Sequence, residues 1–202
     1  MTPATDRLTI RPLESADLEA ALDGVARLRL TVFREWPYLY AGTMDYERWY
    51  LERFARAPGA IVVAAFAGSE LVGAATGAPL AHEHDAFKAP FHERGYAAET
   101  IFYFAESLLL PAYRGQGIGH RFFDRREAHA IRLGFESATF CAVVRPDDHP
   151  LRPPGHRPLD AFWRKRGYTP VAGLRADFGW QDLDRDEETR KPMQFWLRRL
   201  TG

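Results

Sequence analysis

The sequence has a single cysteine, Cys141, and no excess of charge of either sign. One cysteine excludes an internal disulfide framework and favours a reducing compartment, so we expect a cytoplasmic protein. Lysine plus arginine equal aspartate plus glutamate at 27 each, so net charge gives no reason to expect a nucleic-acid or anionic-membrane partner. No apolar run reaches the length that crosses a bilayer.

Residues 101–119 carry the most informative pattern in the chain. Residues 101–110 are an apolar run that predicts a buried strand, and residues 118–133 have the spacing of an amphipathic helix. Between them lies Arg-Gly-Gln-Gly-Ile-Gly, with glycine at every second position. Glycine lets the backbone approach a ligand closely, and the N–H groups at a helix N-terminus attract anions. The segment therefore predicts a site for a pyrophosphate, with Arg114 at its edge.

Three known phosphate-binding turns join a strand to a helix in this way. A nucleoside-triphosphate loop requires Lys-Ser/Thr after its last glycine, but His120 follows Gly119. A dinucleotide fingerprint requires a third glycine at the position of His120. The Arg/Gln-x-x-Gly-x-Gly/Ala loop of the GNAT acyltransferases, which binds the pyrophosphate of coenzyme A, is matched in register by Arg114, Gly117 and Gly119. The chain resembles the GNAT superfamily of N-acetyltransferases.

The resemblance implies an α/β (α+β) fold, with a mixed, mostly antiparallel sheet of about seven strands and helices on both faces. The predicted element order, β, α, α, β, β, β, α, β, α, β, β, is the family's order over nearly the whole chain, which we expect to be one domain, residues 1–202. In this fold the fourth and fifth strands, here residues 101–110 and 138–144, are parallel and splay apart around the pantetheine arm. Residues 81–95 are expected to be a loop.

The resemblance also implies acetyl-CoA as co-substrate and no metal. The residues expected at the cofactor belong to the splayed strand, the glycine loop and a later short helix: Leu108, Leu109, Leu110, Arg114, Gly115, Gln116, Gly117, Ile118, Gly119, His120 and Trp163. Residues 82–85, His-Glu-His-Asp, look like a metal cluster, but their spacing matches no known motif, and a solvated loop is the preferred interpretation.

Acyl transfer to an amine needs a base, a donor for the oxyanion and, in some cases, an acid for the departing thiolate. Glu106 is the predicted base, because it lies on a strand with apolar neighbours, where burial would raise the pKa of its carboxyl group. The alternative is a structural carboxylate paired with an arginine. The oxyanion donor would be a backbone N–H around Leu109 or Leu110.

Trp163 stands where the family usually has its acid, a tyrosine, and an indole supplies no proton at neutral pH. Either the thiolate leaves without an acid, or another group supplies the proton. Tyr168 is the predicted substitute, with His156 and Tyr113 as alternatives. Trp163 itself is expected to pack against the pantetheine arm or the core. A covalent route through Cys141 is disfavoured, because a cysteine in an apolar strand has a raised pKa.

Aromatic residues in a loop after the first helix predict the acceptor site: Phe33, Trp36 and Tyr38. The expected activity is direct transfer of an acetyl group, within a ternary complex, to a primary amine of a small or amino-acid-like molecule. Two alternatives stay open, namely a CoA-binding module with little catalysis and a different acyl-CoA donor. A homodimer is possible, since many members of the family dimerise.

Overall fold

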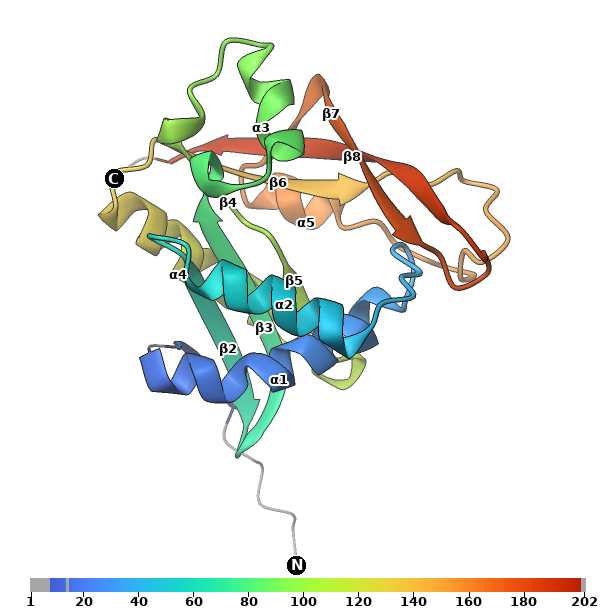
Figure 1. The fold of residues 1–202 in the computed structure, drawn as a ribbon, viewed down its shortest axis with the longest axis horizontal. Helices are drawn as coiled ribbons and strands as arrows, with labels where there is room; N and C mark the ends of the chain where they lie inside the picture. The colour runs from blue at the N-terminus through green and yellow to red at the C-terminus, as the bar shows by residue number, and fades with distance from the viewer. Residues whose placement is uncertain (1–7, 14, 201–202) are drawn as a thin grey trace, which may run out of the picture.

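The centre of the molecule is a mixed sheet with helices on both faces (Figure 1). It is seen in a computed structural model that describes residues 8–13 and 15–200, so the outermost parts of the predicted domain, residues 1–7 and 201–202, lie outside the description. The strand order is β1-β2-β3-β4-β6-β8-β7, with β5 paired to β3 beside β4. In the described part of the chain, the pair β4 and β6 is the only parallel one. The predicted fold class is confirmed.

The order of the elements agrees closely with the predicted order. The strands are β1 (Leu8–Pro12), β2 (Ile61–Ala67), β3 (Glu70–Pro79), β4 (Ile101–Tyr103), β5 (Ser107–Leu109), β6 (Ser137–Val143), β7 (Thr169–Gln181) and β8 (Glu188–Arg199). The helices are α1 (Ser15–Phe33), α2 (Met44–Ala55), α3 (Asp85–His92), α4 (Ile118–Arg132) and α5 (Asp160–Lys165). Three short 3-10 turns are η1 (Leu80–His82), η2 (Ala98–Thr100) and η3 (Pro111–Tyr113).

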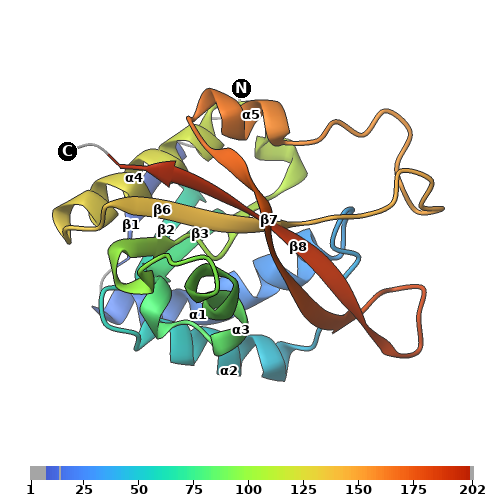
Figure 2. The ribbon, with the colours of Figure 1, turned by 90° about the horizontal axis from the view of Figure 1, so that it is seen from above.

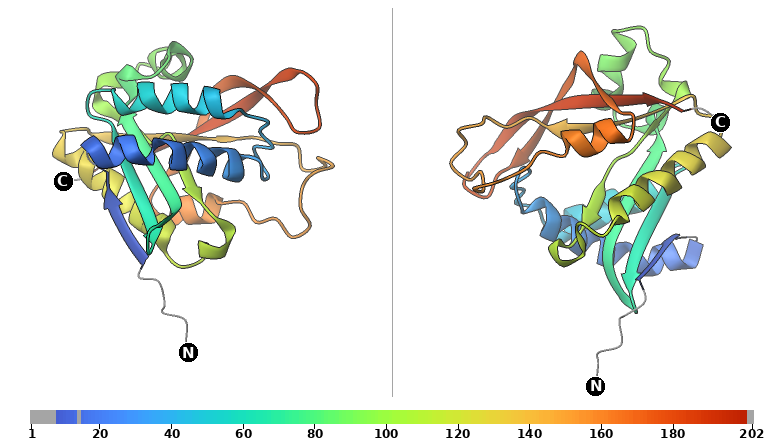
Figure 3. Two further views of the ribbon diagram at one scale, coloured as in Figure 1. Left: turned by 60° about the horizontal axis from the view of Figure 1, so that its bottom comes forward. Right: turned by 180° about the vertical axis from the view of Figure 1, so that it is seen from behind.

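The helices form two layers, which we call the front and back faces of the sheet (Figures 2 and 3). On the front face α1 and α2 pack over β3 and β5, and α3 packs on β7. On the back face α4 crosses β1, β2 and β3 and buries Phe122 and Phe123, while α5 adds Phe162 and Trp163 to the same core. Burial of these apolar side chains on both faces is the main stabilising contribution to the fold.

The strand expected over residues 101–110 is divided by a β-bulge. The Ala105 N–H donates to the Thr76 carbonyl oxygen (3.1 Å), and the Thr76 N–H donates to the Glu106 carbonyl oxygen (3.1 Å). Two residues of one strand therefore face a single residue of β3, which bends the strand and separates β4 from β5. This division accounts for eight strands where about seven were expected.

The bulge also separates β5 from β6. The Phe104 N–H donates to the Thr139 carbonyl oxygen (2.8 Å), which continues the parallel ladder of β4 and β6 by one bond. Beyond that bond β5 pairs with β3, and β6 pairs with β8. Within the described residues no ladder joins β5 to β6. The splay implied by the family resemblance is confirmed.

The expectation of a loop over residues 81–95 is wrong. These residues include the end of η1 and the helix α3, whose first turn is capped by the His84 ring nitrogen accepting from the Ala86 N–H (3.2 Å). Histidine is not a usual N-cap residue, so the sequence signal for a helix start was absent. Pro90 lies inside the helix, and proline usually indicates the end of a helix. Among the described residues, no helix has the length and apolar character needed to cross a membrane.

Candidate functional site

The glycine loop presents open backbone at the start of α4. Gly115 and Gly117 both have φ of +77°, a conformation that side chains other than glycine adopt at a cost. A Cβ atom added at either position would meet no heavy atom within 4 Å, so the space beside the loop is free. The first N–H groups of α4 have no partner within the helix and carry the positive end of its dipole. This geometry fits a diphosphate.

Arg114 lies between the loop and the end of β5. Its Nε donates to the Leu109 carbonyl oxygen (3.1 Å), and its Nη1 donates to Glu35 (2.8 Å). The Gln116 amide donates to the Ala112 carbonyl oxygen (3.1 Å), which fixes the loop internally. Arg114 is half-exposed, so its remaining donors can reach an anion at the loop.

The other predicted cofactor residues are either part of the core or packed beside the glycine loop. The side chains of Leu108 and Ile118 are fully buried, and the Leu108 backbone pairs with Ala74 of β3. Gly119 packs close to the Phe162 ring of α5, and His120 stacks on the same ring with centroids 4.7 Å apart. Trp163 packs between Phe140 and Trp196 on the back face, as expected for a core residue.

The exposed edge of β5 faces the gap left by β6. The Glu106 carbonyl oxygen and the Leu110 N–H both bond to β3, the latter to Val72 (3.0 Å). Because backbone groups alternate between the two sides of a strand, the N–H groups of Ser107 and Leu109 point away from β3. Of the two predicted positions for the oxyanion donor, Leu109 has an N–H group that points toward the gap, whereas the Leu110 N–H group is bonded to Val72. Ser107 has a second N–H group that points toward the gap, which the sequence did not suggest.

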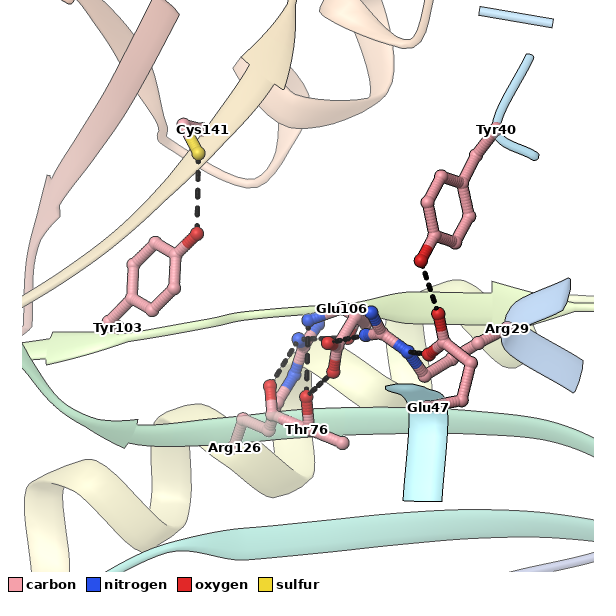
Figure 4. A network of polar contacts seen from close by, with 8 residues as sticks. All are labelled: Arg29, Tyr40, Glu47, Thr76, Tyr103, Glu106, Arg126 and Cys141. Atoms are coloured by element: carbon pink, nitrogen blue, oxygen red, sulfur yellow. Dashed lines mark hydrogen bonds and ion pairs between the residues drawn. The ribbon is translucent and has the colours of Figure 1, made fainter. Parts of the chain in front are cut away.

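Glu106 belongs to a buried network of charges on the front face (Figure 4). One carboxylate oxygen accepts from Arg29 and the other accepts from the Thr76 hydroxyl. Arg29 also donates to Glu47, which accepts from the Tyr40 hydroxyl at 2.8 Å. The exposed fractions are 7% for Arg29, 0% for Glu47 and 6% for Glu106. Two carboxylates thus share one guanidinium, and the network has a net negative charge.

Tyr168, the predicted acid, is fully buried in the back-face core. Its hydroxyl donates to Glu127 (3.0 Å), which also accepts from Arg166 and Arg198. Burial and the Glu127 charge raise the pKa of Tyr168 far above its usual range. In this arrangement the hydroxyl is enclosed in the core and its proton is engaged by Glu127.

Tyr103 and Cys141 meet near the point where β6 departs from β4 (Figure 4), with the hydroxyl 3.3 Å from Sγ. Burial raises the pKa of Cys141 to about 12, so its side chain is a neutral thiol at physiological pH. This protonation state opposes a covalent acyl-enzyme and favours direct transfer.

The predicted acceptor residues are brought to two places. Phe33 and Tyr38 have ring centroids 4.7 Å apart, and the Arg29 guanidinium lies 5.1 Å from the Phe33 ring. These two residues therefore border the charge network. Trp36 packs instead on His149 and His156 of the proline-rich segment.

The loop that carries these aromatic residues is fixed by residues that the sequence did not suggest. Arg145 donates to the carbonyl oxygens of Pro37 (2.8 Å) and Tyr38 (2.7 Å) and forms a two-pronged ion pair with Asp182. The Trp180 indole N–H donates to the same Tyr38 oxygen (2.9 Å). The sequence does not suggest the pairing of Arg145 with Asp182, because no local pattern indicates a partner 37 residues away.

Glu83 is an acidic residue in the short segment between η1 and α3. It follows η1, where its N–H donates to the Leu80 carbonyl oxygen (3.0 Å), and its side chain is half-buried. Burial raises the pKa of its carboxyl group to about 7, and Lys88 partly opposes the shift. The metal cluster that residues 82–85 resemble does not form, since no three potential ligands among the described side chains come together.

The comparisons with known proteins agree with this geometry. A model of the acetyltransferase (GNAT) family matches residues 26–153, which is more than half of the chain. The chain belongs to the GNAT family. This GNAT protein is therefore an N-acetyltransferase by family. No curated protein matches its sequence.

Solved structures extend the GNAT likeness to nearly the whole chain. A ribosomal-protein-alanine N-acetyltransferase from Brucella melitensis is 15% identical with a TM-score of 0.63, covering 95% of this chain and 99% of its own. The protein yncA from Salmonella typhimurium, solved with acetyl-CoA, is 13% identical (TM-score 0.61; 97% and 95% covered). An aminoglycoside 6'-N-acetyltransferase in complex with coenzyme A is 19% identical (TM-score 0.59; 96% and 98% covered). At these identities the likeness establishes the fold.

Proposed function

We propose that this GNAT protein transfers an acetyl group from acetyl-CoA directly to a primary amine within a ternary complex. The observation that carries the proposal is the juxtaposition of two features at the end of β5. The glycine loop offers an anion site, and the edge of β5 next to it offers unpaired N–H groups toward the gap. A cofactor that is a diphosphate at one end and a thioester at the other matches both features at once.

In this proposal residues 114–120 hold the pyrophosphate of acetyl-CoA. The backbone of β5 binds the pantetheine amides, because its outward N–H and C=O groups have the spacing of a strand that lacks a neighbour. His120 and Phe162 lie beside the loop and limit the space on the α5 side. Acetyl-CoA supplies the activated acyl group.

The backbone of Ser107 is suited to stabilise the oxyanion that forms when the amine attacks. Its N–H belongs to the same peptide group as the Glu106 carbonyl, which accepts from both Thr76 (3.1 Å) and the Arg126 guanidinium (2.9 Å). A peptide whose carbonyl accepts a charged donor has a more polarised N–H. Preorganised donors of this kind contribute strongly to acyl transfer.

The acceptor is proposed to approach from the front face as a cationic amine. The network of Arg29, Glu47 and Glu106 carries a net negative charge there, and Phe33 and Tyr38 provide an apolar border. Glu106 is the base that the sequence predicts. Protonation would weaken its ion pair with Arg29, however, so the role proposed for Glu106 is to hold negative charge near the amine.

The proposal is tested by calorimetric titration with acetyl-CoA and, separately, with NADH, followed by assays of thiol release. The acceptor panel contains putrescine, kanamycin and a short peptide with N-terminal alanine, and products are identified by mass. Binding of acetyl-CoA alone and an amine-dependent release of CoA are expected. Binding without release for every amine would favour the CoA-binding module instead.

A further inference from the structure

The segment between α1 and α2 crosses the open end of the gap between β5 and β6 (Figure 1). At one end of this segment Glu35 pairs with Arg114, which follows β5 (2.8 Å). At the other end the Tyr38 carbonyl oxygen accepts from Arg145, which follows β6 (2.7 Å). Because β5 and β6 run in the same direction, both contacts lie at the carboxyl ends of the diverging strands. Residues 35–38 therefore bridge the two strands at the wide end of the gap.

The contacts at the two ends of residues 35–38 differ in burial. Glu35 and Arg114 are partly exposed, and an exposed ion pair contributes little to stability. The side chains of Arg145 and its partner Asp182 are only 8% and 6% exposed. Each nitrogen of the Arg145 guanidinium donates a hydrogen bond, to the Asp182 carboxylate or to the backbone of the segment. Charge-assisted bonds with this forked geometry make Arg145 the firmer of the two anchors.

The same segment continues as a short extension of the sheet beside β7. The Ala41 N–H donates to the Gln181 carbonyl oxygen (2.9 Å), and the Leu183 N–H donates to the Leu39 carbonyl oxygen (2.8 Å). Arg145 and the end of β7 together fix the path of the backbone at Tyr38.

The Tyr38 side chain connects this anchor to the charge network. Its ring lies 4.7 Å from the Phe33 ring, and the Arg29 guanidinium lies 5.1 Å from the Phe33 ring on the way to Glu106. A shift of the Tyr38 backbone would move its ring away from Phe33. The apolar border of the proposed acceptor site would then open.

We propose that Arg145 is a positioning residue that holds the Tyr38 ring against the bound acceptor amine, a role that rests on the acetyltransferase function proposed above. Arg145 acts through Tyr38 rather than on the amine, because each of its nitrogens is already bonded. Its charge is balanced by Asp182, so it does not repel a cationic acceptor.

The test is the variant Arg145→Lys. Lysine keeps the positive charge beside Asp182 but lacks the fork that binds two carbonyl oxygens at once. The KM for the best acceptor among putrescine, kanamycin and the alanine peptide should rise roughly tenfold, with a smaller change in kcat, because binding contacts to the amine are lost. Acetyl-CoA affinity should be unchanged. Arg157→Lys, at an exposed position of the segment that follows β6, should match the wild type.

A double-mutant cycle shows whether Arg145 acts through Tyr38. Tyr38→Ala removes the ring and keeps the carbonyl oxygen that Arg145 binds. In this background Arg145→Lys should change the KM for the amine by less than about twofold, because residues that act through one another are not additive. A rise in KM as large as in the wild-type background would overturn the proposed role.

A further readout does not depend on turnover. The amide groups of Ala41 and Leu183 should exchange with deuterium roughly tenfold faster in Arg145→Lys, because the segment opens locally, while α4 exchanges as in the wild type. Unchanged exchange at both amides would overturn the anchoring.

A second variant keeps the proposal testable without a substitution at Arg145. Trp180→Phe retains a ring but removes the second donor to the Tyr38 carbonyl oxygen, so the KM for the amine should rise about two- to threefold.

The outcomes separate this role from the proposed function. Turnover by the wild type with an unchanged KM for the amine in folded Arg145→Lys would overturn the role of Arg145 alone. A wild type that binds acetyl-CoA but releases no CoA with any of the three acceptors would overturn both.

Discussion

Two buried arginines lie on opposite sides of the β-bulge, and they are neutralised in different ways. Arg29, on the front, pairs with two carboxylates. Arg126, on the back, has no carboxylate partner among residues 8–13 and 15–200 and donates instead to the carbonyl oxygens of Thr76 and Glu106 and to the Ser107 hydroxyl. It also lies between the rings of Phe104 and Phe123, at 4.3 and 4.9 Å.

Because Arg29 pairs with two carboxylates and Arg126 with none of those described, the front and back faces at the bulge carry opposite charge. The front network is net negative, whereas the back retains a full positive charge that is held by dipoles and aromatic faces. Burial is costly for Arg126 and lowers its pKa to about 9, yet it stays charged at physiological pH. The cationic amine proposed on the front and the anionic cofactor proposed at the start of α4 would each be matched by the sign of charge on its own side.

The largest expected effect comes from removing the front arginine. Arg29→Ala leaves Glu47 and Glu106 buried without a cation, which should cost about 3–5 kcal/mol in the free energy of unfolding. Chemical denaturation measures the loss. Arg27→Ala, at an exposed position of the same helix, should change stability by less than about 0.5 kcal/mol. Similar losses for both variants would show that the front network contributes little.

The next largest effect is expected from a negative charge added to the glycine loop. Gly117→Glu places a carboxylate where the pyrophosphate is proposed to bind and should weaken CoA binding at least ~100-fold, equivalent to about 2.7 kcal/mol. Gly155→Glu is the matched control, because Gly155 also has a positive φ (+75°) and open space around it. Calorimetry should find normal CoA affinity for the control. Normal affinity in folded Gly117→Glu would refute the cofactor site.

A smaller effect is expected for the back arginine. Arg126→Met keeps an unbranched chain but leaves two backbone carbonyl oxygens without this donor, which should cost about 1–3 kcal/mol of stability. The Ser107 N–H also becomes less polarised, so kcat should fall roughly tenfold, less than for loss of a direct oxyanion donor. Arg125→Met, on the exposed face of α4, is the control. An unchanged kcat would limit Arg126 to a structural role.

The smallest expected effect is at the edge of the glycine loop. Glu35 pairs with Arg114 at 2.8 Å, and both side chains are partly exposed. Glu35→Gln should release Arg114 and strengthen CoA binding by roughly 1.5–5-fold at low salt, since exposed pairs contribute about 0.2–1 kcal/mol. The gain should disappear at high salt. Equal affinity at every salt concentration would mean that Arg114 does not contact the cofactor.

The contrast between the two sides also explains what the sequence could predict. The glycine loop is local, so Arg114, Gly117 and the following helix could be read from adjacent residues. The charge network is assembled from α1, α2, β3 and β5, and Arg29 lies 77 positions from Glu106. No local pattern indicates such a partner, although an arginine partner for Glu106 was one of the two interpretations.

Arg126 shows a different limit of sequence reasoning. It lies in a run of charged residues that is typical of the solvent face of a helix, yet it is fully buried. Its acceptors are backbone carbonyl groups at a bulge, and a bulge has no side-chain signature in residues 104–107. Tyr168 shows the same limit, because its partner Glu127 could not be distinguished from an exposed helical glutamate.

The bulge at Thr76 resets the alternation of side chains along the strand. Tyr103 and Glu106 both face the front, three positions apart, whereas an uninterrupted strand would turn Glu106 to the back and Ser107 to the front. Pairing of the same residues without the bulge would therefore turn Glu106 toward Arg126 and Ser107 toward Arg29. The separation of charge across the sheet thus depends on the parity of one strand, because the bulge adds one residue between Tyr103 and Glu106 and so keeps both on the front.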